Sequence, residues 1–282
     1  YVEHLRRKYR LDTTEDVLLA AQQLAGGRPP PSTLWKLENR SVATLLFPLH
    51  SLTADGWNDL RESAMKGSAG GKEILRHIVL APSVGGVMGP PSVWMGEGAA
   101  VALARVVQDT ENVDTVDGFP FRFIADSQVA ALKVRGRLRG ERTALAVLCA
   151  LLSVNETVED LDLRDNAFDD ESARLISLAL LQNKTVTSLN LSGNMIGDTG
   201  AQWLSIALEK HPRLESFALR DNRVKSKGAE HLARGISSSP SLVSVNLSGN
   251  PIGPVGCMAL QTALRSNKRV REALIEWGGT NE

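Results

Sequence analysis

Apolar and polar residues recur with a fixed period through the second half of the chain. Strand-like segments of the form apolar-x-Leu-x-x-Asn end at Asn166, Asn194, Asn222 and Asn250, which are 28 residues apart. In each segment apolar residues alternate with other residues, which is the period of a strand with one buried face. The pattern therefore predicts strands near residues 160–163, 188–191, 216–219 and 244–247.

Each of these segments is followed by apolar positions at helical spacing. In one unit they are Ala201, Leu204 and Leu208, which share one face of a helix. The same columns hold in the other units, where a small residue starts the helix. A strand, a turn and a helix cannot bury their apolar edge alone, so neighbouring units must stack on one another.

The asparagine that closes each strand has an expected structural role. A buried side-chain amide can bond the backbone groups that a turning strand leaves unpaired. We therefore expect a structural column of buried asparagines, formed by Asn166, Asn194, Asn222 and Asn250.

The segments LDLRDNAFDDESARLISLALLQN and LNLSGNMIGDTGAQWLSIALEKH resemble the leucine-rich repeats of ribonuclease inhibitor, NOD-like receptors, tropomodulin and the Ran GTPase-activating protein. The resemblance covers residues 141–275, and the alternation of Arg-Asp with Ser-Gly in the turns resembles the two repeat kinds of ribonuclease inhibitor. It implies an α/β solenoid, or horseshoe, with parallel strands on the concave face and helices on the convex face. It also implies a role in binding other proteins, without catalysis.

The first half of the chain is irregular. Residues 1–40 read as a helix at 13–25 followed by a proline-rich linker, residues 41–140 as degenerate repeats with insertions, and residues 141–282 as the regular repeats. Within 41–140 the pattern predicts strands at 45–47, 78–80 and 121–123, a turn and helix at 52–65, and a helix at 96–107. A separate small α/β domain remains the alternative for this part of the chain.

Two insertions, at residues 83–95 and 126–140, are expected to follow strands of adjacent units and to emerge on one edge of the horseshoe. Insertions are free of the stacking that regular units must satisfy, so we expect binding residues there and at the end of the last unit. Aromatic and Arg side chains are common in binding hot spots. The candidates are Trp94, Lys133, Arg135, Arg137, Arg139 and Trp277.

The concave face is expected to be polar and small. Its residues would be Asp162, Arg164, Asn190, Ser192, Ala218, Arg220, Asn246 and Ser248. Arg164 and Arg220 are the candidates for contacts with a partner on this face. A face that is simply solvated is the alternative, and we favour it.

Composition narrows the classes of partner. The chain has 32 basic and 32 acidic residues, whereas nucleic-acid binders usually carry a basic excess. The basic stretch at 133–142 is therefore the one candidate for a nucleic-acid contact. The five histidines and the two cysteines stand at no metal-ligand spacing, so no cofactor is expected. Cys149 and Cys257 lie in apolar columns and are expected to be buried.

These observations favour a non-enzymatic interaction or scaffold subunit of a cytoskeletal, ciliary or organellar assembly, with other protein subunits as partners and no membrane contact. One alternative is a regulator of a GTPase or another enzyme that binds through the repeat surface. Another is an organellar ribosome subunit with a local RNA contact. The expected compartment is intracellular, either the cytoplasm and cytoskeleton or the mitochondrion.

Overall fold

The computed structural model describes residues 17–19, 44–48, 53–69, 77–81, 97–109, 115–116, 121–125, 129–138 and 142–275 of the chain. Contacts between residues divide the chain into unit 1, which comprises 1–126 with 146–150, and unit 2, which comprises 127–145 with 151–282. No helix among the described residues is both long and apolar enough to cross a membrane.

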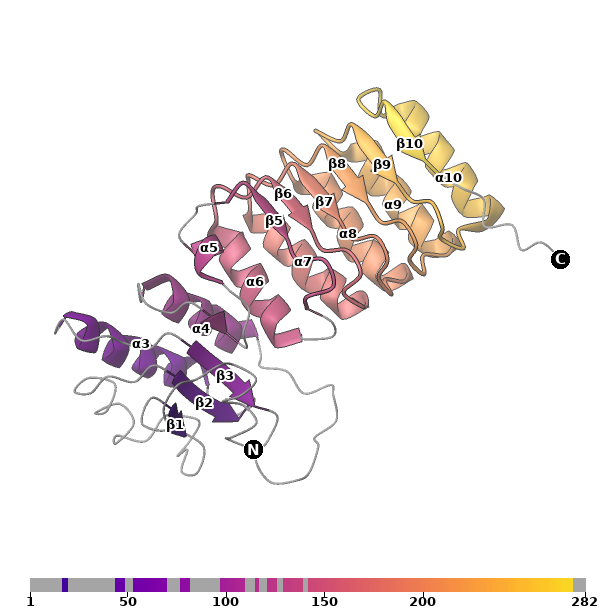
Figure 1. The fold of residues 1–282 in the computed structure, drawn as a ribbon. Coiled ribbons are helices and arrows are strands. Elements are labelled where there is room, and N and C mark those ends of the chain that lie inside the picture. The colour runs from indigo at the N-terminus through magenta and orange to yellow at the C-terminus, as the bar shows by residue number, and fades with distance from the viewer. Residues whose placement is uncertain are drawn as a thin grey trace. The chain divides into compact units, whose positions relative to one another are not determined.

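Unit 2 contains a parallel sheet of six strands in the order β10-β9-β8-β7-β6-β5 (Figure 1). The strands are β5 (Ala131–Lys133), β6 (Asp160–Asp162), β7 (Ser188–Asn190), β8 (Ser216–Ala218), β9 (Ser244–Asn246) and β10 (Glu272–Leu274). The helices between them are α6 (Arg142–Val154), of which residues 146–150 are grouped with unit 1, α7 (Asp170–Gln182), α8 (Asp198–Lys210), α9 (Ser226–Ser238) and α10 (Gly253–Ser266). The four predicted strands and the open α/β solenoid are confirmed.

The core of unit 2 consists of columns that run from strand to strand. Leu163, Leu191, Leu219 and Leu247 have no exposed surface, and the row before them is Leu161, Leu189, Phe217 and Val245, each about 1% exposed. The helices add the small-residue column Ala173, Ala201, Ala229 and Cys257, which is equally buried. The apolar residues of each unit thus pack between its own strand and helix and against the next unit.

A left-handed residue after each strand explains why the turns alternate between Asp and Gly. Asp165 and Asp221 have φ of 58° and 52°, and the glycines at the same position, Gly193 and Gly249, have φ of 70° and 68°. A Cβ on Gly193 would overlap the carboxylate of Asp165, and one on Gly249 would overlap that of Asp221. Side chains at this position in two successive units would compete for the same space, which explains why Asp alternates with Gly.

The helices are capped by the preceding unit as well as by their own residues. Asp169 caps α7 by accepting a bond from Ser172 N. The N-cap residues of α8 and α9 make no such side-chain bond. Instead, Asp170 Oδ1 accepts from Gly197 N at 2.6 Å, and Asp198 Oδ1 accepts from Gly228 N at 2.9 Å. A carboxylate near a helix N-terminus is stabilising, and here it also ties neighbouring units together.

Unit 1 contains a parallel sheet of four strands in the order β1-β2-β3-β4. Its elements are β1 (Val17–Leu19), β2 (Thr44–Pro48), α3 (Ala54–Ala69), β3 (His77–Ala81), α4 (Glu97–Asp109), β4 (Thr115–Val116) and α5 (Arg122–Ala125). Trp57 and Leu60 of α3, Leu103 of α4 and Ile78 of β3 are buried. Sequential parallel strands with helices between them fit both degenerate repeats and a separate small α/β domain. The predicted strands at 45–47 and 78–80 and both predicted helices are confirmed.

Two predicted elements in the first half are wrong. Within the predicted helix at 13–25, residues 17–19 form strand β1, which pairs in parallel with residues 44–46. A short apolar run suits a buried strand as well as a helix, and long-range pairing decided between them. Residues 121–123 are not a strand either, because Ile124 N donates to Phe121 O and begins a helical turn. Phe121 and Ile124 are both buried, a spacing that fits a helix.

The predicted insertion at 126–140 is also wrong, because most of it is the first strand and turn of the regular array. Lys133 pairs with Asp162, and Val134 N donates to Asp162 O at 2.8 Å. Gly136, with φ of 63°, takes the left-handed position. Arg137 then stands in the asparagine column, 29 residues before Asn166, and the change of spacing from 28 hides this unit in the sequence. The predicted insertion at 83–95 lies outside the described residues.

Candidate interaction surfaces

The exposed face of the six-stranded sheet is lined by rows of short side chains. Register places Lys133, Asp162, Asn190, Ala218, Asn246 and Leu274 in one row across the strands. A second row contains Ala131, Asp160, Ser188, Ser216, Ser244 and Glu272. The face is polar and small over β6 to β9, in agreement with the sequence.

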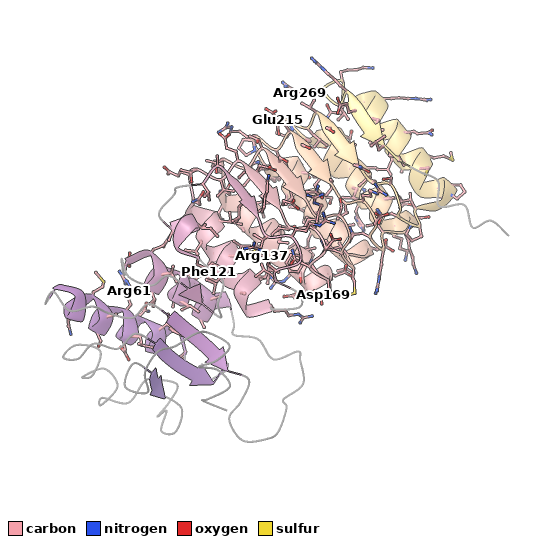
Figure 2. The ribbon with its side chains drawn as sticks, in the orientation of Figure 1. Arg61, Phe121, Arg137, Asp169, Glu215 and Arg269 are labelled. Carbon is pink, nitrogen blue, oxygen red and sulfur yellow. The ribbon has the colours of Figure 1, made fainter. Side chains whose placement is uncertain are left out.

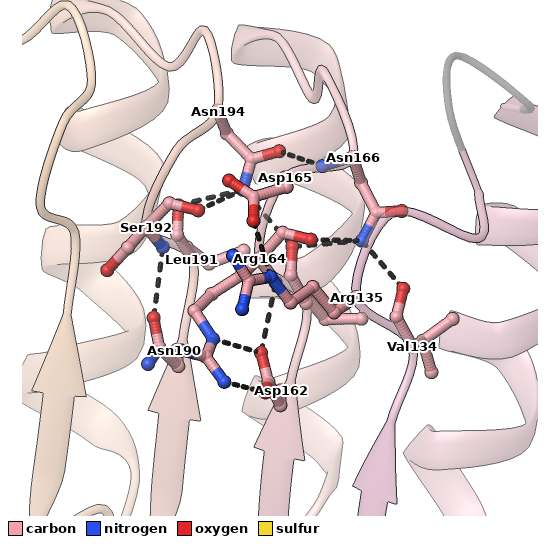
Figure 3. A network of polar contacts seen from close by, with 11 residues as sticks. Val134, Arg135, Asp162, Arg164, Asp165, Asn166, Asn190, Leu191, Ser192 and Asn194 are labelled. Carbon is pink, nitrogen blue, oxygen red and sulfur yellow. Dashed lines mark hydrogen bonds and ion pairs between the residues drawn. The ribbon is translucent and has the colours of Figure 1, made fainter.

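Arg164 is held in an ion pair at the end of its own strand. Its Nε and Nη2 donate to Asp162 Oδ1 at 2.8 Å and to Asp162 Oδ2 at 2.6 Å (Figure 3). This bond from Arg164 keeps the pKa of the Asp162 carboxyl below its usual value, although burial acts against it. Asp162 is buried, so the pair removes one charge of each sign from the concave face.

The remaining basic candidates differ in whether their side chains form ion pairs. Arg135 Nε donates to Asp165 Oδ2 at 2.6 Å, and Arg220 lies 3.0 Å from the carboxylate of Asp221. Both pairs are exposed and contribute little to stability. Lys133 and Arg137 are exposed and form no ion pair with any residue that the structure describes. Lys133 lies in β5, whereas Arg135 and Arg137 lie in the turn that follows it.

Three of the candidate residues, Trp94, Arg139 and Trp277, lie outside the described residues.

The asparagines of the column join neighbouring units through the backbone. Asn194 Nδ2 donates to Leu163 O at 3.1 Å and Leu191 O at 2.8 Å, and its Oδ1 accepts from the backbone N of Asn166 and Phe168 at 3.0 Å each. Asn222 and Asn250 bond the adjacent units in the same way. All four members are buried. The exposed face therefore lies on a scaffold whose turns are fixed.

A second polar column occupies the C-terminal ends of the helices. Asn155, Asn183 and Asn267 are buried there, and Asn183 Nδ2 donates to Leu152 O at 2.7 Å. His211 takes this position in one unit, 1% exposed, and its Nδ1 accepts from Arg213 N. Burial first, then the charges of Lys184 and Arg213, lowers the pKa of His211 to about 4. The imidazole is therefore neutral at pH 7 and structural.

Sequence reasoning missed the exposed apolar side chains of the last unit. Val255 and Met258 on α10 are 59% and 64% exposed, and Leu274 on β10 is 61% exposed. A comparison of each position with its equivalents in the other units would have found them. Figure 2 shows the long side chains that surround β10 at this end of the array, among them Arg269.

Comparisons with known proteins give a family match over part of the repeat array. A family model described as "Leucine Rich repeat" matches residues 154–177, 182–205 and 238–260. No curated protein matches the sequence. Among solved structures, the actin-binding site 2 of leiomodin-1 is 22% identical over 52% of this chain and 86% of its own, with a TM-score of 0.44. A TLR13-ssRNA13 complex is 14% identical over 93% of this chain and 33% of its own, with a TM-score of 0.27.

Proposed function

Because this chain is a leucine-rich-repeat protein of the ribonuclease-inhibitor type, we propose that it is a non-enzymatic subunit that binds other proteins within a larger assembly. The assembly would be cytoskeletal, ciliary or organellar. The chain would hold its partners in place through surfaces of the repeat array, and would regulate or scaffold them without reacting with them.

One observation carries the proposal. The stacked units form one array of six parallel strands, whose turns are fixed by the buried asparagines and by the carboxylates that cap helices of the next unit. A repeat array of this kind presents an extended and preorganised surface, which lowers the ordering cost of binding a protein.

The experiment is purification of the tagged full chain from its own cells at native abundance, followed by native mass spectrometry. We expect a complex of defined mass in which the chain and its partners have fixed stoichiometry. A chain recovered only as a monomer, at concentrations that preserve other complexes of the same cells, would contradict the proposal. A GTPase assay on the purified complex separates a scaffold from a regulator, since only a regulator changes the hydrolysis rate.

A second candidate function rests on Lys133 and Arg137. Both cations are exposed at the first strand of the array and are free of ion pairs within the described part of the chain. They suit an anionic partner, which would be RNA in an organellar ribosome or an acidic protein surface. The test compares ribonuclease treatment of the complex with the double variant Lys133→Ser with Arg137→Ser. If ribonuclease disrupts the complex but the double variant does not, RNA binds elsewhere on the chain.

A further inference from the structure

The last repeat departs from the others at positions that are exposed. At the positions of Val255 and Met258, helices α7, α8 and α9 carry Glu171 and Arg174, Thr199 and Gln202, and Lys227 and Glu230. In the strand row of Leu274, the other strands carry Lys, Asp, Asn or Ala. Only the last unit has large apolar side chains at all three positions, and each is about 60% exposed.

The repeat geometry shows which way part of the last helix faces. Ser237 Oγ of α9 lies 2.7 Å from Ser266 Oγ of α10, and Glu230 of α9 lines the groove between the two helices. The residues 28 positions later, Arg265 and Met258, occupy the same face of α10. Met258 and Arg265 therefore point to where the helix of one more repeat would lie.

Within the described part of the chain, strand β10 of the last unit has an unpaired edge on the side where one more repeat would lie. β10 pairs with β9 on one side, and no described residue pairs with it on the other. Ala273 is exposed, whereas the four residues of its row from β6 to β9 are buried. An exposed edge strand beside apolar side chains is a template for strand addition.

The charge around this edge is basic. Arg265, Lys268, Arg269 and Arg271 are all exposed, and the preceding unit has no charged residue at the equivalent positions, which are Ser237, Pro240, Ser241 and Val243. None of the four cations forms an ion pair with a described residue. Glu272 is the one acidic residue of β10. The surface is thus both apolar and cationic.

We propose that this surface, formed by Val255, Met258, Leu274 and the open edge of β10, binds an acidic segment of another protein, which adds to the sheet as a further strand. The inference rests on the proposed function and names the chemistry of the partner. Apolar side chains of the segment would cover Met258 and Leu274, and its carboxylates would meet the surrounding cations. A second copy of this chain does not fit, because the two identical ends would oppose their like charges.

The probe is a blocked ten-residue peptide that alternates Val with Asp and Glu, labelled for fluorescence anisotropy and titrated with the full chain. One control peptide has Ser in place of Val, and another has proline at alternate positions, which removes the backbone donors needed for pairing. Hydrogen–deuterium exchange of the amides in 272–274, with and without the peptide, reports whether a strand is added.

The protein variants restore residues of the preceding unit. Met258→Glu with Leu274→Asn removes the apolar surface, and Arg265→Ser with Arg269→Ser removes two cations. The matched control for charge is Lys184→Ser with Lys210→Ser, two exposed cations of other units. Circular dichroism melts of every variant verify the fold, and the residues introduced in the two end variants are those that the preceding unit carries at the same repeat positions.

We expect the Val peptide to bind and to slow exchange at 272–274, with each end variant weakening binding by about tenfold and the control leaving it unchanged. Equal binding of the Ser peptide, or unchanged affinity of both end variants, would overturn the proposal. So would slow exchange at 272–274 in the isolated full chain, since the edge of β10 would then already be covered. If the native complex forms while the peptide fails, the proposed function stands and this inference alone falls.

Discussion

The substitution Asn194→Ala tests the structural role of the asparagine column. The side chain makes four bonds of 3.1 Å or less to backbone groups, two as donor to Leu163 O and Leu191 O and two as acceptor from Asn166 N and Phe168 N. Asn194 itself is 6% exposed, so water replaces few of these partners. A buried polar group left unpaired costs about 1–3 kcal/mol.

Carbonyl groups keep a second lone pair for other partners, so the two orphaned N–H groups dominate the cost. We therefore expect Asn194→Ala to lower the free energy of unfolding by about 3 kcal/mol, the upper end of that range. Urea unfolding followed by circular dichroism measures it, with the slope m unchanged and the midpoint shifted to lower urea.

Asn190→Ala is the matched control. Asn190 lies in the same strand region and is half-buried, but its Oδ1 accepts a single bond, from Ser192 N at 3.1 Å. We expect this variant to lose about 1 kcal/mol or less. If the two variants unfold at the same urea concentration, burial of the column amides does not stabilise the array and the reasoning fails.

Four further substitutions or measurements address other features. Gly193→Ala should lower the free energy of unfolding by about 2 kcal/mol or more, since the φ of residue 193 is 70° and the new Cβ overlaps Asp165. Adding Asp165→Gly should recover part of that loss in a double-mutant cycle of urea melts. Strictly additive effects of the two substitutions would refute the overlap. His211 is neutral in the folded protein, with a pKa of about 4 that lies below its unfolded value of 6.5. The free energy of unfolding should therefore be fully present above pH 6.5 and fall by about 3 kcal/mol as the pH drops towards 4. His211→Asn should flatten this pH dependence in melts, and an unchanged slope would refute the assignment. Burial raises the pKa of the Cys149 and Cys257 thiols, so both should react with a thiol reagent only on unfolding; fast reaction in the native protein would contradict their burial. Arg164→Glu with Arg220→Glu should leave binding of the native partner little changed in a pull-down of the folded variant, and a sharp loss would show that the concave face is an interface rather than solvated.

The regular half of the fold was predictable because each position of the repeat has one structural role. The columns of Leu, Ala and Asn fix strand, helix and turn in every unit from β6 to β9, and the structure has them where the period puts them. The alternation of Asp and Gly was visible in the sequence, but its cause was not. It depends on the overlap of Asp165 with a Cβ at residue 193, which only neighbouring units in space reveal.

The first half was harder because its contacts are long-range and its spacing is uneven. Residues 17–19 pair with a strand about 27 residues later, and no local signal distinguishes that strand from a helix. β5 was hidden because its unit is one residue longer and Arg137 stands in place of Asn. The ion pairs of Arg164 and Arg220 could not be predicted either, since they depend on side-chain directions at the strand ends.

The most direct test of the account is hydrogen–deuterium exchange of the full chain, measured alone and within its native assembly. If the chain binds its partner through the open end of the array, amides in residues 255–274 will exchange more slowly in the assembly, with the largest change at 272–274. The concave strands β6 to β8 will change little. Unchanged exchange at 255–274 together with protection of the concave strands would contradict the account.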